Sequence, residues 1–191
     1  MENICAIIDA QGFMCKGKFI PREIAMISRS VDICVQVDTG LDYKEMSHKD
    51  KITNRYIENI LGLSLRPKQK CDSEYNYVIH DLYQRARTLS KRVVGIKNPQ
   101  LGYILSSEGI PWVNLEVFDC PSMSKLDEIY GEYWCCRHHD WMPWSKFRCA
   151  YRKCLYMWRW LNQIKSVKQN SIFMTDYTPV KNDSYDEVDY N

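Results

Sequence analysis

The chain has 191 residues, of which 45% are hydrophobic and 26% are charged, and its formal net charge at pH 7 is +2. A chain of this length can bury one sizeable core without the help of disulfides, and its composition is that of an ordinary globular protein. No apolar run reaches the roughly 18 to 20 residues of a membrane span, and the sequence starts without the basic segment of a signal peptide. We therefore expect a cytoplasmic or nuclear protein with no membrane partner.

The small net charge conceals an asymmetry along the chain. Residues 176–191 contain five acidic residues and one lysine, so the remaining sequence has 25 basic and 19 acidic residues. This surplus is compatible with nucleic-acid binding and equally with an ordinary soluble surface. We expect one domain over residues 1–167, followed by an acidic, disordered tail over residues 168–191.

The N-terminal part of the sequence predicts a meander of strands. A buried strand at residues 3–9 ends in Asp9 and is followed by the turn pair Gln11-Gly12. Further extended segments are expected at residues 13–20, with a hairpin turn at 16–18, and at residues 23–28 and 31–37.

The rest of the sequence predicts alternating helices and strands. After a long connection over residues 41–70, which includes a short helix at 55–61, Ser73 is expected to cap a helix that runs to about residue 90. The later elements are a strand at 92–97, a helix at 99–107 closed by Gly109, a strand at 111–116, a short helix at 122–130 and a long helix at 149–167. The alternation of strand, helix and strand indicates a parallel part of the sheet, so we predict a mixed α/β fold.

This order of elements resembles that of RNase H-like exonuclease folds. In that superfamily the first strand ends in an Asp that binds a catalytic Mg²⁺, usually with a Glu two residues later, because paired carboxylates hold two cations. Asp9 matches the first position, but the second holds Gln11, whose neutral amide supplies no charge. Glu116 and Asp119 are only weak candidates for further carboxylates. Asp9 is thus a vestigial catalytic candidate or a plain strand-end carboxylate, and the catalytic residues stay unknown.

Sulfur and imidazole side chains gather late in the chain, in Cys135-Cys136-Arg137-His138-His139 and at Cys149. Nine cysteines without a secretory signal favour reduced thiols, some of them metal ligands. Cys136, His139 and Cys149 would supply three of the four ligands of a tetrahedral zinc ion. The spacing also allows the pair Cys135 and His138. The alternative is that these cysteines fill a core and the histidines lie at the surface.

A resemblance to a known family follows from these residues together with Pro21-Arg22-Glu23-Ile24-Ala25. A Pro-x-Glu-Ile-Ala segment, a late Cys-x-x-His and a Cys that opens the terminal helix resemble the Maelstrom domain of the animal piRNA pathway, over roughly residues 3–165. The resemblance implies an RNase H-like fold in which a structural zinc ion replaces the exonuclease carboxylates. The ligands that it implies are Glu23, Cys136, His139 and Cys149.

The chain also departs from that family. The HMG box of animal Maelstrom proteins has no counterpart, and residues 41–70 match poorly, so we expect a divergent or standalone member. Glu23 has an alternative role, because after Pro21 it is also placed to cap a turn or to pair with Arg22 or Arg29.

Basic and aromatic residues form a second candidate site, for nucleic acid. The residues expected to contact phosphates are Arg66, Lys68, Lys70, Arg85, Arg87, Lys91, Arg92, Arg148, Arg152 and Lys153. Those expected to stack on bases are Trp141 and Trp144, and also Tyr75 or Tyr77. The alternative is a solvated charged face, with the tryptophans packed around the zinc.

The resemblance implies single-stranded RNA binding with structural zinc and a degenerate exonuclease site, in a role similar to that of piRNA and transposon-silencing factors. It also implies partners from small-RNA pathways, and a weak single-stranded RNA nuclease activity that leaves enzyme status open. One alternative is an active metal-dependent 3′–5′ exonuclease of the DEDD type that uses Asp9. Another is a protein-interaction scaffold that recruits partners through the acidic tail.

Overall fold

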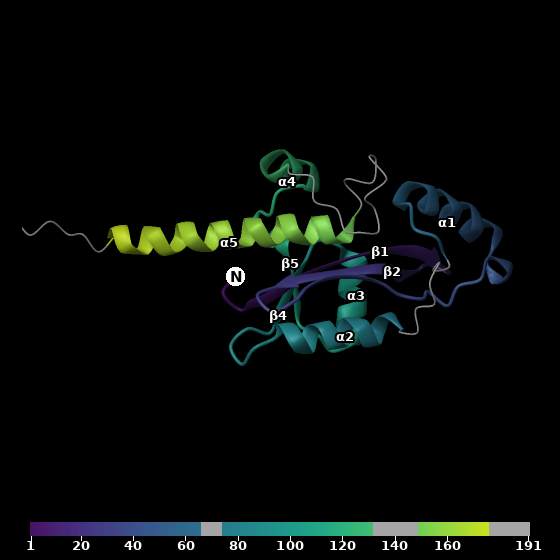
Figure 1. Ribbon diagram of the computed structural model, residues 1–191, viewed down its shortest axis with the longest axis horizontal. Helices are drawn as coiled ribbons and strands as arrows, with labels where there is room; N and C mark the ends of the chain where they lie inside the picture. Colours follow the sequence, from purple (N-terminus) through teal and green to yellow (C-terminus); the bar gives the residue numbers. More distant parts are fainter. Residues whose placement is uncertain (66–73, 132–148, 176–191) are drawn as a thin grey trace, which may run out of the picture.

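The computed structural model describes residues 1–65, 74–131 and 149–175, which form an α/β structure around a mixed five-stranded sheet (Figure 1). The strands are β1 (Ile4–Cys15), β2 (Lys18–Ser28), β3 (Asp32–Gln36), β4 (Val93–Ile96) and β5 (Trp112–Asn114). The helices are α1 (His48–Leu61), α2 (Tyr75–Ala86), α3 (Pro99–Ser107), α4 (Met123–Tyr130) and α5 (Ala150–Thr175), with 3-10 turns η1 (Tyr43–Glu45) and η2 (Leu115–Phe118).

The sheet has the order β3-β2-β1-β4-β5 and combines two kinds of pairing. The first three strands pair antiparallel, whereas β4 lies parallel to β1 and β5 lies parallel to β4. Parallel neighbours require a crossover connection, and α3 supplies the one between β4 and β5. The predicted mixed α/β sheet, with antiparallel strands first and a β-α-β part after them, is confirmed.

The first hairpin is longer than the sequence predicts. β1 continues through Gln11-Gly12, where we expected a turn, and the chain reverses only at the hairpin turn that we predicted at residues 16–18. The φ angles of Lys16 and Gly17, 52° and 76°, fit a tight two-residue hairpin. Gly12 marks a shift in the β1–β2 register, and a Cβ atom there would collide with the carbonyl oxygen of Ile20. This glycine is needed for close strand contact at a bulge, so it does not end the strand.

Two hydrophobic cores cover the two faces of the sheet. Successive strand residues point to opposite faces, so Ile8 packs in the core beneath α2 and α3 while Ile7 packs in the core beneath α5. Figure 1 shows α5 along one face, with α4 beyond it, and α2 and α3 along the other. β1 is therefore central to both cores.

Helix α1 lies beside the hairpin end of β1 and begins earlier than predicted, at His48 in place of residue 55. Ser47 caps it by accepting a hydrogen bond from the backbone N–H of Asp50. Its fully buried Asn54 donates to the carbonyl of Met14 at 2.8 Å and accepts from the N–H of Met14 at 3.0 Å. These two bonds fix the helix to the strand.

The remaining boundaries follow the predictions unevenly. α3 spans the predicted residues, with Asn98 as N-cap and Pro99 in its first turn. α2 ends at Ala86, before the predicted residue 90, and Ser73 lies outside the described residues. α5 continues past residue 167, where we expected the tail to begin, and reaches Thr175.

Candidate functional site

Three polar residues lie on the face of the sheet that α5 covers. Asp9, Gln11 and Glu23 share this face because Gln11 and Glu23 are direct partners in the β1–β2 register, while Asp9 is two residues before Gln11. Asp9 and Glu23 are buried, with 3% and 0% of their surface exposed. The first turns of α5 therefore lie over a polar part of an otherwise apolar face.

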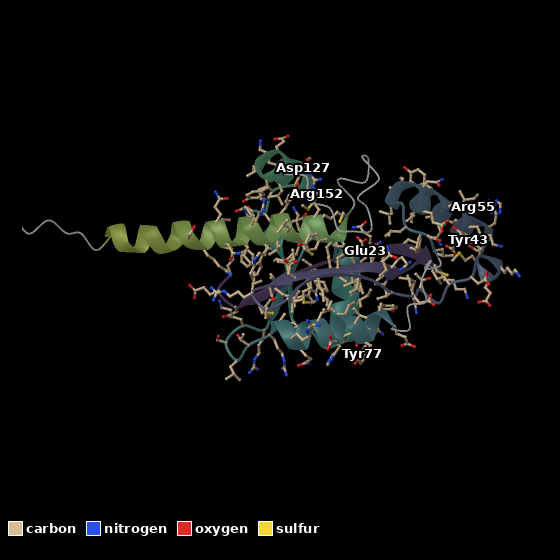
Figure 2. All side chains as sticks on the ribbon, in the orientation of Figure 1. Glu23, Tyr43, Arg55, Tyr77, Asp127 and Arg152 are labelled. Carbon is tan, nitrogen blue, oxygen red and sulfur yellow. The ribbon has the colours of Figure 1, made fainter. Side chains whose placement is uncertain are left out.

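Glu23 contacts the start of α5. Its Oε1 accepts a hydrogen bond of 3.0 Å from the backbone N–H of Ala150, and Cys149, the preceding residue, is also fully buried. Figure 2 shows Glu23 beside the end of α5 at which the helix begins. The structure thus brings together the two residues to which the family resemblance assigns the first and last zinc ligands.

A carboxylate and a thiol are ligands that zinc accepts, and both groups are removed from water here. A buried carboxylate is stable only when donors or a cation compensate for its lost hydration. The donor set of Glu23 and Cys149 is thus compatible with zinc. The other expected ligands, Cys136 and His139, lie outside the described residues, as do Cys135 and His138 of the alternative pair. In the described part of the chain, no three metal-binding side chains are grouped.

Asp9 faces a lysine of α5. The ammonium of Lys153 lies 3.5 Å from Oδ2 of Asp9, and the side-chain amide of Gln11 donates to the same oxygen at 3.1 Å. Burial raises the pKa of Asp9, while Lys153 and Gln11 act in the opposite direction. The ammonium of Lys153 and the amide of Gln11 therefore contact the carboxylate of Asp9, which would bind Mg²⁺ in an exonuclease.

Asp9 lines a cavity of about 400 Å³ beside the carboxyl ends of β4 and β5. At its edge Lys97 donates to the carbonyl oxygens of Cys120 and Pro121, at 3.0 and 2.6 Å, and lies 3.8 Å from Glu116. The polar residues that line the cavity are Asp9, Gln11, Lys97, Asn98, Gln100, Glu116, Ser122 and Lys153. The two weak carboxylate candidates differ, because Glu116 lines this cavity and Asp119 does not.

The described RNA-binding candidates lie in different environments. Arg87 and Arg92 are exposed, and Arg85 is half exposed in an ion pair with Asp81 at 3.5 Å. Arg152 is 3% exposed, and its guanidinium contacts Asp127 and the hydroxyl of Tyr156. Lys91 is half-buried, and Lys153 faces Asp9. Six further candidates, Arg66, Lys68, Lys70, Trp141, Trp144 and Arg148, lie outside the described residues.

The two tyrosines proposed for stacking also differ. Tyr77 is 71% exposed on α2, so its ring is accessible to a ligand, whereas Tyr75 packs against the core between α2 and the sheet. Figure 2 shows Tyr77 on the side of α2 that faces away from the sheet.

Two residues of the cavity were not predicted for it, Lys97 and Lys153 as the partner of Asp9, although the sequence carries a signal for each. Lys97 is the last residue of the strand predicted at 92–97, and the carboxyl ends of parallel strands are where α/β folds bind ligands. Lys153 lies between Ala150 and Cys154 on the apolar side of α5, and a charged residue on a buried stripe requires a partner.

No protein-family model, no curated protein and no solved structure matches this chain. Within the described ranges, no helix is long and apolar enough to span a membrane.

Proposed function

We propose that this chain is an RNase H-like domain that binds single-stranded RNA in the cytoplasm or nucleus and is stabilised by a structural zinc ion. Its role would be similar to that of the piRNA and transposon-silencing factors whose domain it resembles. One observation carries the proposal. Ala150, the residue after Cys149, donates a buried hydrogen bond to Glu23, and the resemblance assigns Glu23 and Cys149 to one metal site.

The zinc ligands would be Glu23 from β2, Cys136, His139 and Cys149. Four protein ligands leave no open position for a reactive water, so the ion has a structural role. Bound zinc would contact the buried carboxylate of Glu23 and the buried sulfur of Cys149. It would also fix the start of α5 to the centre of the sheet.

The surroundings of Asp9 support a degenerate catalytic site. Two-metal exonucleases need several carboxylates around their cations, because each carboxylate offsets part of the metal charge. Asp9 instead contacts Lys153 and Gln11, and burial raises its pKa. Any weak nuclease activity of this domain is therefore expected to be independent of Mg²⁺.

An active DEDD-type exonuclease is the competing function, and one observation favours it. Asp9 and Glu116 both line the cavity beside β4 and β5. That enzyme would require Mg²⁺ or Mn²⁺ and would lose activity in Asp9→Ala, whereas our proposal predicts that Asp9→Ala still binds RNA.

The zinc hypothesis is tested by elemental analysis of the purified chain and by thermal unfolding with and without a chelator. We expect about one zinc per chain, and a fall in Tm of about 10 °C or more after chelation or in Cys149→Ser, because metal-binding energy contributes directly to folding. Glu23→Gln should lower zinc content and Tm in the same direction.

Cys15→Ser is the matched control, since Cys15 is a partly exposed thiol near the hairpin turn of β1. It should retain both zinc and Tm. A wild-type chain without zinc, whose Tm is insensitive to chelation, would contradict the zinc hypothesis.

The RNA hypothesis is tested by fluorescence anisotropy with a labelled single-stranded oligoribonucleotide, together with a nuclease assay with and without Mg²⁺. We expect salt-dependent binding by the wild type and by Asp9→Ala. Mg²⁺-dependent degradation that disappears in Asp9→Ala would establish the exonuclease instead. Failure to bind any oligonucleotide at low salt would favour the scaffold.

A further inference from the structure

A second pocket of about 170 Å³ lies beside the middle of α5 and the start of β1. Its lining residues are Ile4, Cys5, Arg29, Ser30, Ala86, Thr88, Lys91, Trp158, Asn162 and Lys165. Lys165 follows Ala150 by about four turns, so it lies roughly 22 Å along the helix from the start of α5, where Glu23 binds Ala150. The pocket is therefore separate from both the expected zinc site and the Asp9 cavity.

Three cations from three different elements meet at this pocket. Arg29 comes from the β2–β3 turn, Lys91 from the α2–β4 turn and Lys165 from α5. No ion pair joins any of the three to an acidic side chain within residues 1–65, 74–131 and 149–166. Burial lowers the pKa of Lys165, and the charges of Lys91 and Arg29 lower it further, with Glu2 acting in the opposite direction. The cations thus repel one another, and a bound anion would relieve that repulsion.

Hydrogen bonds fix the backbone of the two turns that carry Arg29 and Lys91. Ser28 Oγ accepts from the N–H groups of Ser30 and Val31, at 3.0 and 2.8 Å, which shapes the turn around Arg29. The N–H of Lys91 donates to Thr88 Oγ1 at 3.0 Å, and the N–H of Thr88 donates to the carbonyl of Lys91 at 2.9 Å. Binding an anion would therefore require little ordering of the backbone, which lowers the entropic cost of binding.

The pocket also has an apolar wall. Trp158 is partly buried and lines the pocket together with Ile4, Cys5 and Ala86. Cations beside an aromatic ring suit a ligand that has both an anionic group and a flat base, and nucleotides have both. An inorganic anion would contact only the cationic side chains and not the ring of Trp158.

The neighbouring surface continues the positive charge. Arg87 and Arg92 are exposed residues of the same α2–β4 connection. Both contact Tyr83 through their backbones, since the tyrosine hydroxyl donates to the carbonyl of Arg92 at 3.0 Å and the N–H of Arg87 donates to the carbonyl of Tyr83 at 2.9 Å. When one nucleotide of a nucleic-acid strand occupies the pocket, this surface can contact the phosphates of the adjoining nucleotides.

We propose that this pocket binds one nucleotide of single-stranded RNA, with the phosphate contacting Arg29, Lys91 and Lys165 and the base stacked on Trp158. The inference rests on the proposed RNA-binding function and assigns a location to it. It depends on neither the zinc ion nor Asp9.

The test compares two full-length triple variants in anisotropy titrations with a labelled oligouridine at several salt concentrations. The first variant carries Arg29→Ala, Lys91→Ala and Lys165→Ala. The control carries Lys44→Ala, Lys49→Ala and Lys125→Ala, which removes the same charge from exposed sites elsewhere. We expect binding at least tenfold weaker for the first variant, with a slope of log K against log salt reduced in magnitude by about 2. The control should change binding less than threefold.

The first variant should fold, because it removes like charges that repel each other, and its Tm is checked beside the titrations. Trp158→Leu, which keeps an apolar side chain, should weaken binding to oligouridine more than to an abasic strand of equal charge. Equal effects of the two triple variants would overturn the inference while leaving RNA binding itself intact. A wild type that binds no RNA would instead remove the proposed function, and the inference with it. Competition by inorganic phosphate or AMP as strong as that of the oligonucleotide would identify a small-anion site and overturn the assignment to RNA.

Discussion

At the scale of single residues, the most unusual group is the Asp9 carboxylate, which is buried in the centre of the sheet face beneath α5. Burial raises its pKa, so the folded protein holds this proton more tightly than the unfolded chain does. The ionised form then reduces stability, and this cost appears as the pH rises through the raised pKa. Lys153 and Gln11 offset only part of the cost, because the net direction of the pKa shift is upward.

We predict that Asp9→Asn gains stability relative to the wild type as the pH rises from below the ordinary range of aspartate to neutrality. The difference in unfolding free energy, measured by urea denaturation at a series of pH values, should change in favour of the variant across the raised pKa. In a Lys153→Met background the midpoint of this change should move to higher pH, because the opposing charge is gone. A difference that is constant with pH would contradict the prediction.

The structural role of a residue was predictable where the sequence carries a local signal. Asn98 and Ser122 cap their helices as their residue types favour. The partner of Asp9 was not predictable, because the 3.5 Å contact joins residues 144 positions apart and depends on how α5 is placed on the sheet. Glu23 was proposed as a zinc ligand only through the family resemblance, and nothing in its local sequence indicates that the residue is fully buried.

At the scale of elements, a largely buried ion pair joins α4 to α5, beside the apolar contact of Leu126 with the same core. The guanidinium of Arg152 on α5 contacts the carboxylate of Asp127 on α4, and the hydroxyl of Tyr156 donates to the same carboxylate at 2.9 Å. The side chains of Arg152 and Asp127 are only 4% and 20% exposed, so water screens this pair weakly. Figure 2 shows Asp127 and Arg152 together between α4 and α5.

We predict that Asp127→Ala lowers the unfolding free energy by about 3 kcal/mol, because it leaves the charge of Arg152 buried beside a lost partner. Glu128→Ala is the control in the next residue. Its pair with Lys125 is more than 60% exposed on both sides, so its removal should cost less than about 1 kcal/mol. Urea denaturation of both variants measures the difference, and equal losses would show that Asp127 does not stabilise the contact between the helices.

Element boundaries were predictable where they depend on local capping and not where they depend on pairing. Pro99 and Gly109 predicted both ends of α3. Ser47 and Asp50 carried an equally local signal for the start of α1, which the irregular composition around them concealed. Gly12 was misread, because a glycine in a bulge and a glycine in a turn look alike until the partner strand is known.

At the scale of the molecule, the two cores share one sheet, and this sharing decides how the protein should unfold. Leu105 on α3 belongs to one core and Leu161 on α5 to the other, and both are fully buried. The alternate residues Ile7 and Ile8 of β1 pack into opposite cores, so neither core can lose its sheet face while the other keeps an intact β1. The molecule should therefore unfold as one cooperative unit.

We predict that Leu105→Ala and Leu161→Ala each lower the unfolding free energy by about 2 to 5 kcal/mol, and that the two losses add in the double variant, because the residues lie on opposite faces of the sheet. Urea unfolding should be followed both by far-ultraviolet circular dichroism and by tryptophan fluorescence, to which Trp158 and Trp160 of α5 contribute. The two signals should coincide in every variant, since α5 cannot leave the sheet without exposing β1. Separate transitions in Leu105→Ala, with fluorescence unchanged while circular dichroism falls, would show that the core under α5 persists alone and that the sheet does not couple the two.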